Sequence, residues 1–163
     1  MPHSDISHPK AEIRLPEQGL VAVHVGVGVA VLLTNLAAGL WGGYAWYRQA
    51  PSEGFWYLLR VAQVVVILQA LVGTFLLLTG RESPDGLHYL YGVLPVLVSM
   101  LAEGARAGAG ARELEGIDFD ALPRERKRLV ALAIFRRETG IMAVSALVVF
   151  GLALRAAGTS TFL

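Results

Sequence analysis

The sequence contains no cysteine among its 163 residues. This absence excludes disulfide bonds, iron–sulfur clusters, thiolate ligation of haem and covalent attachment of a c-type haem. No nucleophile–base pair, phosphate-binding loop or carboxylate pair marks the chain as an enzyme. The net charge is only +1 and no basic recognition motif is present, which indicates that nucleic acid is not a partner.

Charge is also scarce in four long apolar segments, where Arg60 and Arg155 are the only charged residues. Of all residues 55% are hydrophobic, and the mean hydropathy is +0.54. The hydrocarbon core of a bilayer is about 30 Å thick and needs about 20 apolar residues in a helix. Three segments meet this length, and interfacial tyrosines extend a shorter one; they are Leu20–Tyr47, Trp56–Thr79, Thr139–Ala157 and the shorter Leu87–Ala102. The sequence predicts an all-α membrane protein, a bundle of four transmembrane helices running alternately up and down.

Two regions follow from this pattern. Residues 1–18 form a polar tail with three prolines and no evident cleavable signal peptide, and its His3 and His8 are expected to be solvated. Residues 19–163 form the membrane domain, with helices at about 20–47, 56–79, 87–103 and 123–157. The run "ARAGAGA" after the third helix is expected to be flexible.

The basic residues indicate the orientation. The segment 103–137 holds eight of the 14 Lys and Arg residues. Cytoplasmic loops carry such an excess, so this loop is predicted to be cytoplasmic, with both chain termini outside the plasma membrane. The expected partner is the lipid bilayer, and a homodimer or subunits of a respiratory complex are further candidates.

Two histidines lie near the predicted outer surface, each within the first turns of a span. His24 opens the first span and His88 opens the third, so both belong to the outer leaflet. Alternate helices of an up-and-down bundle lie diagonally across its core, roughly 12–14 Å apart. Two imidazoles with a metal ion between them would fill that distance, which predicts a b-type haem with His24 and His88 as axial ligands. The alternative is a pair of interfacial residues bonded to water or backbone.

Other residues are candidates for the same site. Gly28 and Gly92 each follow a histidine by four residues and so share its helix face, as does Tyr91. Such glycines would leave room for a flat macrocycle, or they mediate close helix packing, because small residues do so in lipid. Gln69 is a candidate for a hydrogen bond to a histidine or a quinone, and the alternative is an interhelical hydrogen bond without a ligand. Arg155 and Arg81 are candidates for haem propionates; for each arginine, a snorkelling anchor is the alternative.

The segment "LQALVGTFLLLTGRESPDGLHYLYG", residues 68–92, resembles the haem A synthase and cytochrome oxidase assembly family. In that family a helix carries a Gln-x-x-x-Gly element, a short external loop follows, and a histidine opens the next helix. Gln69, Gly73 and His88 stand at these positions, and His24 resembles the partner histidine. The resemblance covers about residues 17–102 and implies an integral membrane protein that binds haem near the outer face.

The chain also departs from the family pattern. It is long enough for one of the family's two four-helix halves, it lacks the external cysteine pair, and its fourth span has no histidine. The glutamate expected close before the first histidine is represented only by Glu17, seven residues earlier. The resemblance therefore implies haem binding, and a haem-modifying oxidoreductase only by analogy.

Three functions are compatible with these features. The first is a bis-histidine haem b protein in electron transfer or in haem handling for respiratory oxidase assembly. The second is a haem-free structural or assembly subunit of a membrane respiratory complex. The third is a quinone-binding subunit, which would use Gln69 and His88.

Overall fold

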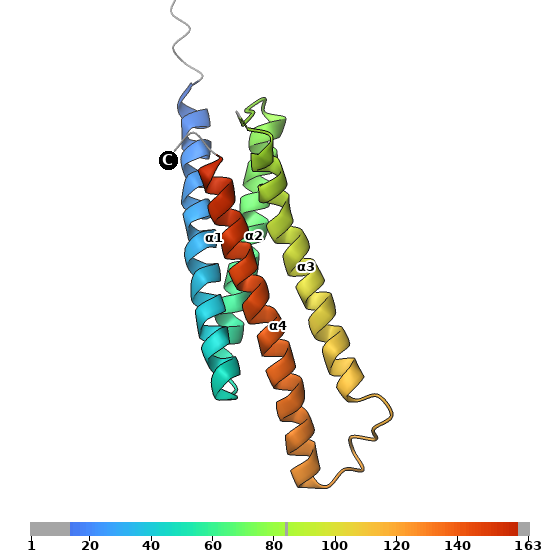
Figure 1. Ribbon diagram of the computed structural model, residues 1–163. Coiled ribbons are helices and arrows are strands. Elements are labelled where there is room, and N and C mark those ends of the chain that lie inside the picture. Colours follow the sequence, from blue (N-terminus) through green and yellow to red (C-terminus); the bar gives the residue numbers. More distant parts are fainter. Residues whose placement is uncertain (1–13, 84, 160–163) are drawn as a thin grey trace, which may run out of the picture.

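The computed structural model describes residues 14–83 and 85–159, and the side chains from residue 19 onward. Four helices account for most of this part: α1 (Arg14–Arg48), α2 (Glu53–Leu78), α3 (Leu87–Glu113) and α4 (Arg124–Gly158). Successive helices run in opposite directions (Figure 1). The predicted four-helix up-and-down bundle is confirmed.

All four helices are long and apolar enough to cross a membrane. The shortest, α2, has 26 residues and is therefore about 39 Å long. Large apolar side chains cover the outside of the bundle; Leu33 and Leu40 are more than 60% exposed. An exposed apolar surface of this extent belongs in lipid, where helices satisfy their own backbone hydrogen bonds. The chain is a multi-pass membrane protein in contact with the bilayer.

The helices are not packed equally. α4 packs closely against both α1 and α3, and α1 packs against α2, whereas α2 and α3 contact each other much less. The order around the bundle is therefore α1, α2, α3, α4. In this order α1 lies diagonally opposite α3.

Small residues bring the helices together in the core. An alanine-rich cluster fills one half of the bundle and a valine cluster fills its middle; their members are Ala38, Phe55, Leu59, Ala102, Met142 and Ala146, and Val31, Val66 and Val149. Gly39 of α1 faces Leu147 of α4, and Gly42 faces Phe55. Close approach through glycine and alanine is the usual way to gain van der Waals contact between helices in lipid.

Two helix boundaries differ from the sequence prediction. The "ARAGAGA" run is not flexible, because α3 continues through it to Glu113. Alanine favours the helix, and the small side chains let α4 approach: Ala109 is fully buried, and Gly110 faces Ile134 and Glu138. α1 begins at Arg14, so the helix includes part of the predicted tail. Residues 1–13 of that tail, with His3 and His8, lie outside the described residues, as does the side chain of Glu17.

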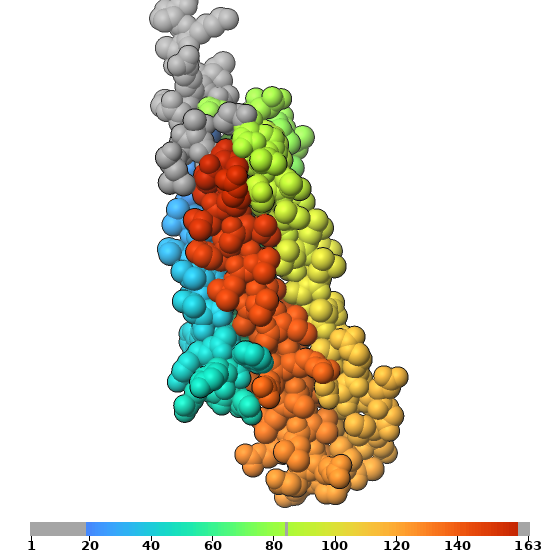
Figure 2. Space-filling model, viewed as in Figure 1, coloured from blue at the N-terminus to red at the C-terminus, as the bar shows by residue number. Residues whose placement is uncertain are grey.

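The two ends of the bundle differ in shape. At one end, here called the basic end, α4 and the loop that joins it to α3 extend well past the turn between α1 and α2 (Figures 1 and 2). Trp46, close to that turn, packs against Gly140. Residues 124–139 of α4 therefore project beyond this level by roughly 20 Å. The opposite end, here called the histidine end, carries the start of α1, the α2–α3 loop and the end of α4.

Candidate functional site

His24 and His88 meet across the histidine end of the bundle. His24 lies on α1 and His88 is the second residue of α3, on the diagonally opposite helix. The centres of the two imidazole rings are 6.1 Å apart, and the ring planes are tilted by 58°. The structure thus brings together two residues that are 64 positions apart in the sequence.

The α2–α3 loop fixes the start of α3 and with it the position of His88. The Asp85 carboxylate accepts a hydrogen bond from the backbone N–H of Leu87 at 2.9 Å. The Asp85 carbonyl accepts one from the backbone N–H of His88 at 3.1 Å. The Ser83 backbone N–H donates to the Tyr89 hydroxyl at 2.7 Å. The first two bonds use backbone donors that a helix start leaves unpaired, and the third ties the loop to the first turn of α3.

One ring nitrogen of His88 is hydrogen-bonded to the backbone of α4. Its Nδ1 lies 3.1 Å from the carbonyl oxygen of Ala156 in the last turn of α4. Because a carbonyl only accepts, Nδ1 carries a proton, and in the neutral ring Nε2 keeps its lone pair. The same carbonyl accepts from the backbone and hydroxyl of Thr159, at 3.2 and 2.8 Å. A histidine that ligates a metal commonly donates its other N–H to a backbone carbonyl in this way.

His24 is paired with Gln69 of α2. The amide nitrogen of Gln69 lies 3.3 Å from Nε2 of His24. The amide donates to Nε2 in this arrangement; when it is turned over, its carbonyl accepts from Nε2–H and Nδ1 keeps the lone pair. Nδ1 of His24 and Oε1 of Gln69 are both buried and have no hydrogen-bond partner. The pair therefore leaves polar atoms in the interior with unused hydrogen-bonding capacity.

Glycines provide the space for this pair. A Cβ atom on Gly28 would lie 3.1 Å from the Gln69 amide nitrogen, and one on Gly73 would lie 3.1 Å from Cε1 of His24. Gly28 thus fits the packing alternative, since it makes room for Gln69. A Cβ on Gly92 would meet no atom within 4 Å. Clearance for a macrocycle at Gly28 and Gly92 remains a prediction.

The remaining predicted residues lie near the same end. The Arg155 guanidinium of α4 lies over the ring of Tyr91, 5.7 Å from its centre. This is a cation–π contact, and it places a positive charge one residue before Ala156, which bonds His88. Arg81 is exposed in the α2–α3 loop.

The spacing of the two rings is compatible with one metal ion shared between them. Two imidazoles that hold one metal ion from opposite sides, each through a nitrogen about 2 Å away, have ring centres roughly 6 Å apart. Among the described residues no group of three or more His, Cys, Asp and Glu could hold a metal ion. A metal held by protein ligands alone usually needs four, whereas a porphyrin supplies four nitrogens and needs only two axial ligands.

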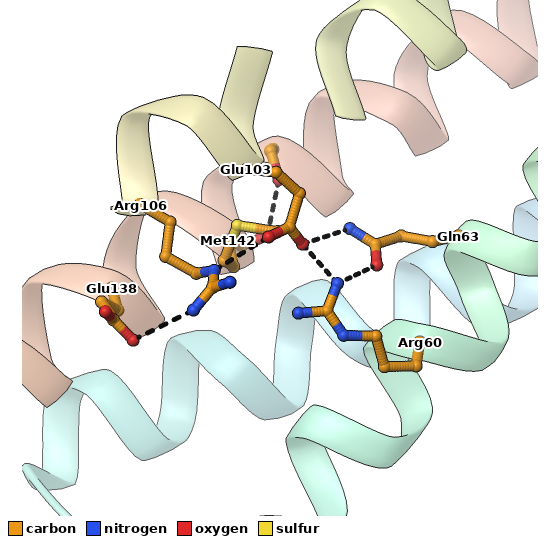
Figure 3. A network of polar contacts seen from close by, with 7 residues as sticks. Arg60, Gln63, Glu103, Arg106, Glu138 and Met142 are labelled. Atoms are coloured by element: carbon orange, nitrogen blue, oxygen red, sulfur yellow. Dashed lines mark hydrogen bonds and ion pairs between the residues drawn. The ribbon is translucent and has the colours of Figure 1, made fainter. Parts of the chain in front are cut away.

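A second polar cluster lies toward the basic end. The Glu103 carboxylate of α3 accepts hydrogen bonds from Arg60 and Gln63 of α2 and from Arg106, at 2.5, 2.8 and 2.9 Å (Figure 3). Arg106 also pairs with Glu138 of α4 at 3.5 Å. The cluster joins α2 to α3, the two neighbouring helices that pack least, so it stabilises the bundle on that side.

Glu103 is expected to matter more than any one of its partners. Replacing Glu103 with leucine leaves two arginines and Gln63 without their shared acceptor, which is expected to lower the free energy of unfolding by about 1–3 kcal/mol. Replacing the half-exposed Arg60 with leucine removes one partner only and should cost less than about 1 kcal/mol. Unfolding of the purified protein by SDS in mixed micelles measures both values. Equal losses would show that Glu103 is not the centre of the cluster.

No protein-family model, curated protein or solved structure matches the chain. By its fold the chain is a multi-pass membrane protein of four helices. The histidine pair is its candidate functional site.

Proposed function

We propose that the protein is a membrane haem b protein in which His24 and His88 are the axial ligands. The separation of 6.1 Å between the ring centres carries this proposal, because it is the separation that a shared metal ion requires. The bond from His88 to the Ala156 carbonyl supports it, since that bond leaves Nε2 available as a ligand. The resemblance of residues 68–92 to the haem A synthase family points to the same group.

The surrounding residues have defined parts in this proposal. A haem with two histidine ligands supplies a one-electron couple and has no open coordination position. His24 and His88 orient the group, and Arg155 beside Tyr91 offers a positive charge to a propionate, as does Arg81. We therefore propose electron transfer or haem handling as the activity.

The visible spectrum tests this function. The protein is purified in mild detergent from haem-replete cells, and its spectrum is recorded oxidised and after reduction with dithionite. We expect a six-coordinate, low-spin b-type spectrum. A colourless protein with the helix content of the native bundle by circular dichroism would overturn the proposal.

Quinone binding is the second candidate, favoured by the unpartnered Oε1 of Gln69 and Nδ1 of His24. With the Gln69 amide donating to Nε2, Nδ1 of His24 carries the proton, so Oε1 would accept from a quinol hydroxyl, or Nδ1–H would donate to a quinone carbonyl. Solvent extraction of the purified protein followed by chromatography distinguishes the candidates. A stoichiometric quinone with no haem spectrum would favour this one.

The proposed orientation places the basic end in the cytoplasm and the histidine pair at the outer face of the plasma membrane. The excess of arginine and lysine in residues 103–137 supports it. Because the chain has no cysteine, single substitutions report topology directly. On intact cells an impermeant maleimide is expected to label Glu82→Cys and to label Ala121→Cys only after lysis. The reverse pattern would invert the orientation.

A further inference from the structure

The contact between α1 and α2 near His24 is reciprocal. On α1, His24 is followed four residues later by Gly28; on α2, Gln69 is followed four residues later by Gly73. Each long side chain lies against the glycine of the other helix: Gln69 against Gly28, and His24 against Gly73. The two side chains then meet at 3.3 Å. This arrangement permits the imidazole of His24 only a narrow range of positions between the two helices.

We propose that Gln69 is a positioning residue that fixes the orientation and the protonated nitrogen of the His24 ring. This inference rests on the proposed haem function, and it assigns to Gln69 a part in tuning the iron. An acceptor on the free N–H of a metal-bound imidazole fixes its tautomer and strengthens its donation to the metal. Gln69 is the side chain that meets His24 in this way, whereas His88 has a backbone carbonyl.

The hydrogen bonding of the pair depends on which way the Gln69 amide faces. In one form its N–H donates to Nε2 of His24, and Oε1 of Gln69 and Nδ1 of His24 are buried without a hydrogen bond. In the form that is turned over, Oε1 accepts from Nε2–H and Nδ1 keeps its lone pair, while the amide N–H groups take the place without a partner. An interhelical hydrogen bond alone is satisfied by either form, whereas a metal-binding His24 requires the second.

Two substitutions of Gln69 test this role, because they are expected to shift the midpoint potential of the bound haem in opposite directions. Gln69→Leu removes the acceptor, so the ring donates less to the iron and the midpoint potential is expected to rise. Gln69→Glu keeps an acceptor and adds negative charge, so the potential is expected to fall. Gln63→Leu is the matched control, because it makes the same change on α2 in the Glu103 cluster, and its potential should equal that of the wild type.

A purely structural role predicts no such pair of opposite shifts. Gln69→Leu and Gln69→Glu would then both resemble the wild type, or both shift in the same direction as the bundle loosens. Either result would overturn the inference. The low-spin electron paramagnetic resonance signal, which depends on the orientation of the axial rings, should change in Gln69→Leu and not in Gln63→Leu.

A measurement without haem separates the inference from the function on which it rests. The haem-free protein is labelled with nitrogen-15 in its histidines, and the His24 resonances are assigned by their loss in His24→Ala. In the wild type we expect His24 to populate one neutral tautomer, and in Gln69→Leu a mixture of two. A wild type that never binds haem but keeps this single tautomer would refute the haem function alone. Equal tautomer populations in both proteins would refute the positioning role of Gln69.

Discussion

Replacing His88 with glycine is expected to abolish the six-coordinate b-type spectrum. The loss of a hydrogen bond to a metal ligand already costs roughly 10–100-fold in metal affinity, and the loss of the ligand itself should cost more. His88→Gly also removes the bond to the Ala156 carbonyl, worth about 0.5–1.5 kcal/mol, so the bundle should remain folded. Haem content per purified protein and the reduced-minus-oxidised spectrum measure the effect.

Added imidazole distinguishes a lost ligand from a damaged fold. His88→Gly leaves a space of the shape of the deleted ring, so imidazole in the buffer is expected to restore the six-coordinate spectrum. His24→Gly should behave in the same way, because the two rings share one metal ion in this proposal. Rescue of neither variant, with both still folded, would show that the rings do not ligate the iron.

The tail histidines provide the matched control. His3→Ala combined with His8→Ala removes as many histidines as the double variant His24→Ala, His88→Ala, but none from the four helices that the structure describes. The tail variant should retain the wild-type spectrum and the bundle variant should have none. Loss of haem from the tail variant would contradict the assignment of the ligands.

The sequence predicted the fold because the bilayer restricts it so strongly. A chain with four apolar segments of spanning length has few architectures available, and the opposed positions of α1 and α3 follow from their alternation. His24 and His88 could be placed at one end for the same reason. Their separation of 6.1 Å depends on helix rotation and side-chain conformation, which length and hydropathy do not specify.

The neighbours of the histidines were harder to predict. In a lipid-exposed helix both the outward and the inward faces are apolar, so hydropathy does not mark the face that meets another helix. The spacing His24–Gly28 was recognised, but its contact with Gln69 depends on the rotation of α2 against α1. The same limitation applies to Glu103, whose partners Arg60 and Gln63 lie on another helix. Gly28 and Gly92 each follow a histidine by four residues, so the sequence does not distinguish them. In the structure only Gly28 faces a side chain.

Replacing Gly42 with valine is expected to have the largest effect on stability. A Cβ on Gly42 would lie 2.9 Å from Cβ of Ala143 on α4 and closer still to the ring of Phe55 on α2. Phe55 is fully buried, so its ring has no free space into which to move. α1 would have to separate from both neighbours, and such overpacking costs about 1–3 kcal/mol or more. Unfolding in mixed micelles measures the change in the free energy of unfolding.

Gly43 supplies a control at the next position of the same helix. A Cβ on Gly43 meets no atom within 4 Å, so Gly43→Val adds the same side chain at a position where its Cβ has no close neighbour. Glycine inside a helix is less stable than alanine by roughly 0.5–1 kcal/mol, so Gly43→Ala should stabilise the protein while Gly42→Ala should destabilise it. This difference in sign arises only if α1, α2 and α4 converge at Gly42. Equal stability of the two alanine variants would show that the helices are further apart there, and that the bundle is held together at other points.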